Sequence, residues 1–98
     1  MVGWDNTPRL QDNGQIFVNN HPANYSRWLS AIVERTRRTR EPEERIVFVN
    51  AWNEWGEGCH LEPDQAFGRA FLERHERRTR AGGRPGRRAL NTRIHYRR

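Results

Sequence analysis

A helix is predicted between Pro22 and Pro42, where apolar side chains recur at the three- and four-residue spacing of a helix with one buried face. The apolar positions are Tyr25, Trp28, Leu29, Ile32, Val33 and Thr36. Proline suits the first helical position, and Asn20 or His21 can act as the cap. Pro42 is expected to end the helix because proline cannot continue it.

A buried strand is predicted after this helix. It begins near Arg45, and the run Ile46 to Val49 is apolar at every position. Such a run is typical of a strand that is buried on both faces, as in a parallel sheet covered by helices. Residues 1–4 are interpreted as the end of an earlier strand, and residues 15–19 as a short extended segment.

A second helix is predicted from Pro63, with Asp64 in its first turn. Its apolar face carries Phe67, Ala70 and Phe71. The expected order is strand, loop, helix, strand, loop, helix and tail, which is two consecutive β/α units of an α/β fold. Two parallel strands alone leave both sheet edges open, so this unit is expected to have further neighbours.

The chain divides by charge near its C-terminal end. Residues 1–73 have a net charge of −3 and residues 74–98 a net charge of +9, and every cation is arginine. Glycine, proline and like charge in residues 79–98 predict a disordered tail after a structured part at residues 1–78. The ten arginines of residues 74–98 could attract an anionic polymer such as nucleic acid. Nucleic acid is the less favoured partner, because the tail has only one aromatic residue, Tyr96, and no recognisable binding module.

Several classes of protein are excluded or disfavoured by composition. No apolar run approaches the ~20 residues of a membrane span, and no basic segment followed by an apolar one indicates a signal peptide. The single cysteine, Cys59, cannot form an intrachain disulfide, which agrees with a reducing compartment and a cytoplasmic location. The 98 residues fall far short of the ~250 of a complete (β/α)8 barrel.

The predicted strand ends in a cluster of acids, amides, indoles and glycines at residues 50–58. In α/β sheets, functional side chains gather at the carboxyl ends of the strands, because the loops converge there. Glu54 and Glu57 are therefore candidate functional residues. The alternative is that both are solvated or helix-capping carboxylates.

Recognisable motifs lie at Val2 to Arg9, Tyr25, Trp28-Leu29, Asn50 to Gly58, His60 to Asp64 and Phe67 to Ala70. In these residues the chain resembles the C-terminal part of the glycosyltransferase WbsX family, which is also described as glycoside hydrolase family 99-like. The motifs cover roughly residues 2–73. The resemblance implies a (β/α)8-type barrel of which most is outside this chain, acting on a glycan or an activated sugar in polysaccharide or lipopolysaccharide biosynthesis.

The same resemblance implies roles for the two acids. Glu57 corresponds to a general acid/base and Glu54 to a carboxylate that assists attack by taking a proton from the sugar's own 2-hydroxyl group. The choice between transferase and hydrolase stays open. So do two other interpretations, a non-enzymatic anionic-polymer binder acting through the tail and a truncated, non-functional product. Partners implied are the sugar substrate and the missing N-terminal part of the barrel.

Further residues around the two acids are candidates for sugar binding. Indole faces stack on the C–H faces of sugars, and amides exchange hydrogen bonds with hydroxyl groups. The candidates are Trp4, Asp5, Asn53, Trp55, His60 and Glu62, with Asn6 and Arg9 placed to reach the same edge. The alternatives are core packing for Trp52, turn formation for Asp5, and complementing a helix N-terminus for Glu62.

A metal site is not predicted. Cys59, His60 and Glu62 are close in sequence, but zinc needs three or four convergent ligands and the others are not identifiable. No cofactor is predicted either.

Overall fold

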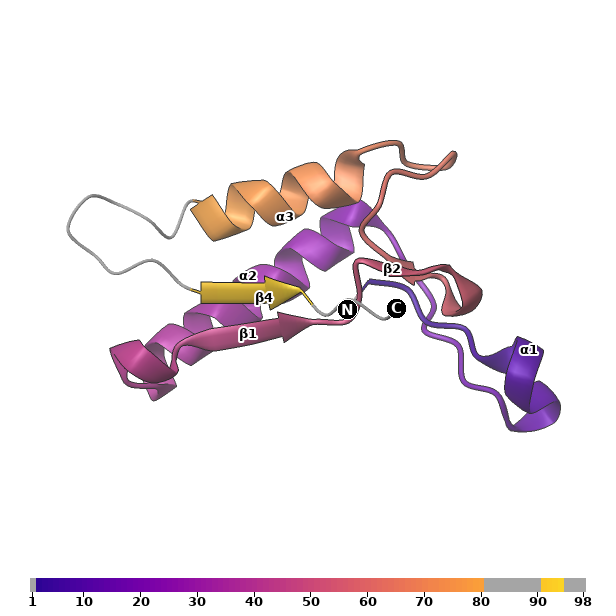
Figure 1. Ribbon diagram of the computed structural model, residues 1–98, viewed down its shortest axis with the longest axis horizontal. Coiled ribbons are helices and arrows are strands. Elements are labelled where there is room, and N and C mark those ends of the chain that lie inside the picture. Colours follow the sequence, from indigo (N-terminus) through magenta and orange to yellow (C-terminus); the bar gives the residue numbers. More distant parts are fainter. Residues whose placement is uncertain (1, 81–90, 95–98) are drawn as a thin grey trace.

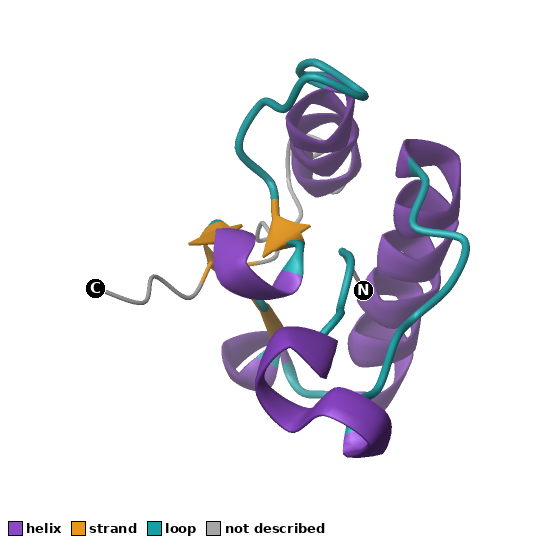
Figure 2. Ribbon diagram, turned by 90° about the vertical axis from the view of Figure 1, so that its right-hand side faces the viewer, coloured by secondary structure: helices purple, strands orange, loops and turns teal. Residues whose placement is uncertain are grey.

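The computed structural model describes residues 2–80 and the backbone of residues 91–94, and it consists of two long helices beside short strands (Figure 1). The elements in chain order are α1 (Thr7–Leu10), η1 (Gln11–Asn13), α2 (Pro22–Thr39), η2 (Pro42–Glu44), β1 (Ile46–Val49), β2 (Asn53–Glu54), η3 (Trp55–Glu57), β3 (Cys59–His60), α3 (Ala70–Arg80) and β4 (Asn91–Ile94). Helix α2 packs against both α3 and β1. In Figure 2 one long helix lies above the small strands and the other lies to their right.

Helix α2 confirms the predicted helix at both ends. His21 is its N-cap, with Nδ1 accepting a hydrogen bond from the backbone N–H of Ala23 at 3.2 Å, and Pro22 takes the first helical position. The helix ends at Thr39, ahead of Pro42. The predicted apolar face is the buried one, which includes Tyr25, Leu29 and Val33.

Strand β1 confirms the predicted strand, but the prediction that both of its faces are buried is wrong. Val47 and Val49 are buried against the core, whereas Phe48 is 67% exposed. The reason is that α2 packs on the face that carries the two valines, and Phe48 points to the other face. Burial of this second face would need elements beyond the described residues.

Strand β4 is a correction to the predicted disordered tail. It pairs in parallel with β1, with Ile46 opposite Asn91 and Val49 opposite Ile94. The order β1, α3, β4 is strand–helix–strand, in which the helical crossover returns the chain to a parallel neighbour. Helix α3 also extends into the predicted tail, as far as Arg80. The rest of that tail, residues 81–90 and 95–98, lies outside the described residues.

The first predicted strand does not form. Residues 2–4 are not part of a strand, and the nearest pairing is an isolated antiparallel bridge between Asp5 and Ile16. The first of the two expected β/α units therefore lacks its strand. The mixture of helices and small sheets is compatible with the α/β class.

The second predicted helix starts later than expected, at Ala70 instead of Pro63. Residues 64–68 form a tight turn, in which Asp64 and Gly68 exchange backbone hydrogen bonds. The side chain of Asp64 also accepts a hydrogen bond from the backbone N–H of Phe67. Gly68 has a φ of +55°, in the left-handed region that favours glycine, so the helix cannot run through this position.

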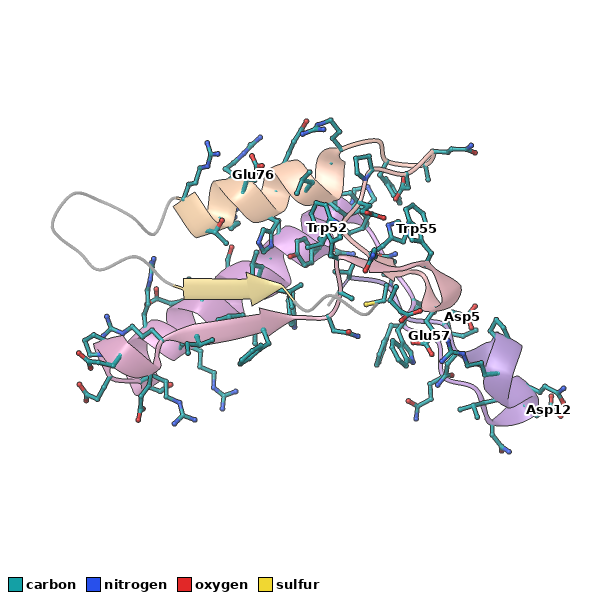
Figure 3. The ribbon with its side chains drawn as sticks, in the orientation of Figure 1. Asp5, Asp12, Trp52, Trp55, Glu57 and Glu76 are labelled. Atoms are coloured by element: carbon teal, nitrogen blue, oxygen red, sulfur yellow. The ribbon has the colours of Figure 1, made fainter. Side chains whose placement is uncertain are left out.

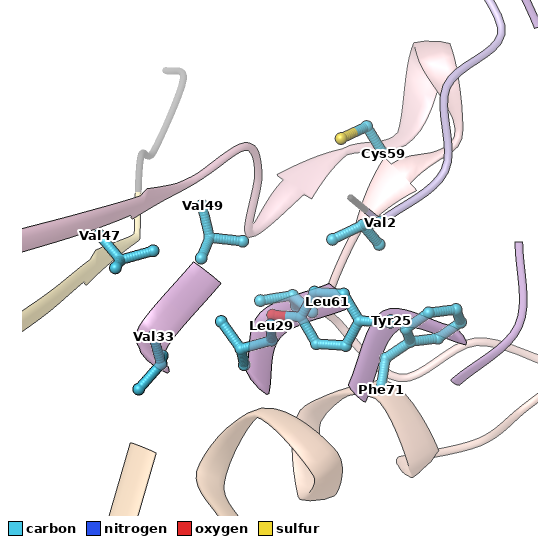
Figure 4. Close-up of a cluster of buried hydrophobic side chains, with 9 residues drawn as sticks. All are labelled: Val2, Tyr25, Leu29, Val33, Val47, Val49, Cys59, Leu61 and Phe71. Carbon is cyan, nitrogen blue, oxygen red and sulfur yellow. The ribbon is translucent and has the colours of Figure 1, made fainter. Parts of the chain in front are cut away.

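The core lies between α2, α3 and the strands. Figure 4 shows its buried side chains, which are Val2, Tyr25, Leu29, Val33, Val47, Val49, Cys59, Leu61 and Phe71. Cys59 and Leu61 belong to the segment around β3, so the core fixes the loop that follows β1. No helix among the described residues is long and apolar enough to cross a membrane.

Candidate functional site

A short antiparallel hairpin, formed by β2, η3 and β3, carries both candidate acids. It follows β1 directly, after a cis peptide bond between Asn50 and Ala51. Asn53 pairs with His60, and Glu54 pairs with Cys59. The carbonyl of Trp52 accepts hydrogen bonds from the backbone N–H groups of Leu61 and Glu62, and these bonds close the base of the hairpin. Glu54 therefore lies on β2, and Glu57 lies at the tip of the hairpin.

Glu57 is a buried carboxylate with a cationic partner. Its side chain is only 7% exposed, and its Oε1 lies 3.1 Å from Nη1 of Arg9, whose side chain is 59% exposed. The backbone carbonyl of Glu57 accepts a hydrogen bond from the N–H of Asp5 at 2.8 Å. Figure 3 shows Asp5 and Glu57 next to each other beside the hairpin. The segment that contains Asp5 and Arg9 is thus fastened to the hairpin tip.

Glu54 and the cation Arg9 both approach Gly56. A Cβ built on Gly56 would be 3.4 Å from Oε1 of Glu54 and 3.8 Å from Nη2 of Arg9, so the carboxylate and the guanidinium flank one point. Both acids also act on the nearby thiol. Burial raises the pKa of Cys59 above its usual value, and the negative charges of Glu54 and Glu57 raise it further. The two candidate acids therefore gather around Arg9 and Cys59.

A second group of side chains surrounds Trp55. Its indole stacks on the ring of His60, with centroids 3.7 Å apart and planes 15° apart. The indole Nε1–H donates a hydrogen bond to Oε2 of Glu62 at 2.7 Å. Nε2 of His60 lies 4.0 Å from Oδ2 of Asp64. His60 covers one face of the indole. Since Trp55 is 49% exposed, much of the rest of the indole is open to solvent.

The two groups lie on opposite sides of the hairpin. In Figure 3, Trp52 and Trp55 are above it, whereas Asp5 and Glu57 are below it. Residues that are adjacent in sequence at the predicted site are thus separated in space. The acidic group, with Arg9, and the indole group, with His60 and Glu62, form two distinct surfaces.

Comparison with known proteins identifies the family. The family model described as Glycosyltransferase WbsX matches residues 1–75. The chain belongs to the glycosyltransferase WbsX family. The resemblance drawn from the sequence motifs is therefore confirmed at the level of the family.

Two curated relatives extend this result. Both are named uncharacterized protein WxcX and come from two strains of Xanthomonas campestris pv. campestris. Each is 44% identical over 71 residues, which are 72% of this chain. The chain spans only about a tenth of the length of these relatives, because the match covers 10% of each. No solved structure matches the chain.

Some of the candidate residues in this WbsX segment have structural roles, in core packing or in turn formation. Trp4 and Trp52 are partly buried and pack against the core. Asp5 Oδ1 accepts hydrogen bonds from the backbone N–H and the hydroxyl group of Thr7, at 3.0 and 2.6 Å. These hydrogen bonds hold the pKa of Asp5 below its usual value. Asp5 thus forms a turn that leads into α1, and Asn53 is exposed on β2.

The structure adds Arg9 to the acidic group, because Arg9 forms an ion pair with Glu57. The sequence placed it near the same edge, but nothing in the sequence indicated that it would pair with Glu57. A metal site has no support in the described part of the chain, where no three His, Cys, Asp or Glu side chains are placed to hold an ion. Cys59 instead donates its S–H to the carbonyl of Asn50 at 2.7 Å.

Proposed function

We propose that this chain carries the acid/base pair of a glycan-active WbsX-type enzyme, with Glu57 as the general acid/base and Glu54 as the assisting carboxylate. The observation that supports this most is the state of Glu57. It is nearly buried, yet its partner Arg9 is largely exposed and its side chain can move away without unpacking the core. A substrate that displaces Arg9 would meet a carboxylate that is shielded from bulk water.

The chemistry needs two carboxylates with different tasks. As the glycosidic bond breaks, Glu57 donates its proton to the leaving oxygen. Glu54 takes the proton of the sugar's 2-hydroxyl group as that oxygen attacks the anomeric carbon. The oxygen of the incoming hydroxyl group, from water or from a sugar acceptor, then attacks the anomeric carbon and gives its proton to Glu57. The bond between the 2-oxygen and the anomeric carbon breaks in this step, and the 2-oxygen takes its proton back from Glu54. The same pair can serve hydrolysis or transfer, and the acceptor decides between them.

Trp55 fits a binding role outside the reacting pair. Its contacts with His60 and Glu62 fix the indole before any ligand arrives, which lowers the entropy cost of binding. The C–H face of a sugar can stack on its exposed side. Because Trp55 and Glu57 lie on opposite sides of the hairpin, Trp55 would hold a part of the glycan that is not reacting.

We further propose that this segment lies in the C-terminal part of a (β/α)8-type barrel, in an enzyme of polysaccharide or lipopolysaccharide biosynthesis. The exposed face of β1 at Phe48 supports this placement, because a strand in a barrel has its second face covered by the interior. The hairpin also follows the carboxyl end of β1, where barrel enzymes carry their functional residues. The missing strands and helices would come from the rest of a family-length protein.

The test uses a family-length protein. The 71 matched residues of WxcX are replaced by those of this chain, and sugar transfer or hydrolysis is followed by mass spectrometry with nucleotide sugars and extracted polysaccharide. Glu57→Gln should lower turnover by at least about 100-fold, because it removes proton transfer and keeps the shape of the side chain. The control is Glu73→Gln, which neutralises an exposed acid on α3. Equal turnover in the two variants would remove Glu57 from its proposed role.

A further inference from the structure

A groove of ≈ 410 Å³ separates the extended segment at residues 17–20 from α2. Its lining includes two aromatic residues, Phe17 and Trp28, and three amides, Asn19, Asn20 and Asn24. Two valines complete the described lining, so none of the described residues that line the groove has a charged side chain. Its volume lies at the lower end of the range of about 300–1,000 Å³ for small-molecule sites.

The walls of the groove are held together by hydrogen bonds. The backbone N–H of Phe17 donates to the carbonyl of Trp4 at 2.9 Å, which fixes the extended segment. Nδ2 of Asn24 donates to the carbonyl of Asn19 at 3.0 Å, which joins this segment to α2. Because this hydrogen bond fixes the amide group of Asn24, it also fixes the direction of the acceptor oxygen Oδ1. Asn24 and Trp28 are four residues apart and lie on the same side of α2.

One wall of the groove packs beside the hairpin of the candidate site. A Cβ built on Gly3 would lie 2.6 Å from the side-chain nitrogen of Asn20 and would overlap the carbonyl oxygen of Gly58. Asn20 and Gly58 therefore meet over Gly3. Since Gly58 follows Glu57, the Asn20 wall of the groove lies near the hairpin tip that carries Glu57.

We propose that the groove is a subsite for a neutral sugar residue of an extended glycan, next to the residue that reacts at Glu57. Amides offer both donors and acceptors to neighbouring sugar hydroxyl groups, and the two aromatic faces suit sugar C–H groups. The described residues of the lining include no cation, which disfavours a phosphate or a uronate at this position. The link to Glu57 rests on the proposed function, whereas binding of a neutral sugar in the groove does not depend on it.

The test is an NMR titration of the ¹⁵N-labelled, full 98-residue chain with glucose, galactose, mannose, rhamnose, maltose, cellobiose and lactose. Signals of the Trp28 indole N–H and of the Asn20 and Asn24 side-chain amides report on the groove. The Trp55 indole N–H reports separately on the hairpin. We expect saturable shifts of the groove signals with at least one disaccharide, with a Kd on the order of 1–10 mM. Glucuronate is the charged comparison and should leave the groove signals in place.

Matched variants locate the binding. Phe17→Ala removes a half-exposed ring from the groove and Asn24→Ala removes an amide, so each should weaken binding by at least about fivefold. The controls are Leu10→Ala and Asn13→Ala, which remove a similarly exposed apolar side chain and an exposed amide elsewhere. They should leave the affinity unchanged. The dispersion of the backbone signals shows whether each variant is folded.

The outcomes separate the subsite from the proposed function. If no neutral saccharide shifts the groove signals of the folded chain, the subsite is refuted, whatever Glu57 does in the family-length protein. Equal shifts with glucuronate and glucose would refute the neutral selectivity. If the groove binds a disaccharide while Glu57→Gln keeps full turnover, the proposed catalytic role fails and the groove stands as a sugar site.

Discussion

Arg9 and Glu57 form an ion pair of 3.1 Å that joins the N-terminal segment to the tip of the β2–β3 hairpin. The pair combines a carboxylate that is nearly buried with a guanidinium that is mostly exposed. Loss of the cation would leave the carboxylate in a low-dielectric environment without its partner, but water can still reach the position that Arg9 vacates. The contribution of the pair to stability should therefore be modest.

Arg9→Gln should lower the free energy of unfolding by about 1 kcal/mol. The measurement is urea denaturation followed by circular dichroism. Arg27→Gln is the control, because Arg27 is exposed on α2 and its replacement removes the same charge. If both variants lose the same stability, the ion pair does not stabilise the fold.

Gly3 is expected to tolerate no side chain. A Cβ there would overlap the carbonyl of Gly58 and the amide of Asn20, so Gly3→Ala should cost about 1–3 kcal/mol through displaced backbone. At Gly56 the nearest atom to a Cβ is Oε1 of Glu54 at 3.4 Å, which is an ordinary contact. Gly56→Ala should therefore change stability by less than about 0.5 kcal/mol. Thermal unfolding of the two variants tests the contrast, and equal melting temperatures would contradict it.

Tyr25 and His75 form a buried hydrogen bond between α2 and α3. The hydroxyl group of Tyr25 lies 2.8 Å from Nδ1 of His75, and burial raises the pKa of Tyr25 so that the hydroxyl group stays protonated. Tyr25→Phe leaves this histidine nitrogen without its partner and should cost about 1–2 kcal/mol. Thr39→Val removes an exposed hydroxyl group from α2 and should change little. An unchanged urea midpoint for Tyr25→Phe would show that the hydrogen bond adds nothing.

The same histidine should make stability depend on pH. Burial lowers the pKa of His75 below its usual value, and the charge of Glu76 offsets this only in part. When the pH falls below the unfolded-state pKa of about 6.5, the unfolded chain binds the proton more readily than the folded one. The stabilisation is therefore complete above this pH and is lost as the pH falls through the pKa of the folded state.

Urea midpoints at about pH 7.5 and about pH 5.5 measure this dependence. The urea midpoint should decrease less on acidification in His75→Gln than in the unchanged chain. His21→Asn is the matched control, because it removes another histidine and keeps a side chain that can cap α2. Equal decreases in all three proteins would assign the pH dependence to other groups.

Cys59 should be protected from alkylation in the folded chain. It is fully buried, its S–H donates to the carbonyl of Asn50, and burial raises its pKa, so little thiolate forms. Modification by iodoacetamide should therefore follow unfolding and speed up on adding urea. The intact mass gives the modified fraction directly, since the chain has one cysteine. Rapid labelling without denaturant would show that the hairpin opens locally.

The parts of the fold that were predicted correctly are those with local signals. Helix α2 has a regular apolar face, a cap at His21 and a proline at each boundary, and β1 is a continuous apolar run. Strand β4 has no such signal, because Asn91–Ile94 lies in an arginine- and glycine-rich region and forms only by pairing with β1. The late start of α3 follows from the turn between Asp64 and Gly68, which competes with the helix signal at Pro63.

For the candidate site, the sequence alone predicted the family, which the comparison confirms, and it put the two candidate acids just after strand β1. The tertiary structure decided which side chains meet. It paired Arg9 with Glu57, placed Trp55 on the other side of the hairpin, and formed a groove between residues 17–20 and α2. These contacts join segments that are distant in the chain, and their geometry depends on how the helices and the hairpin pack on the shared core.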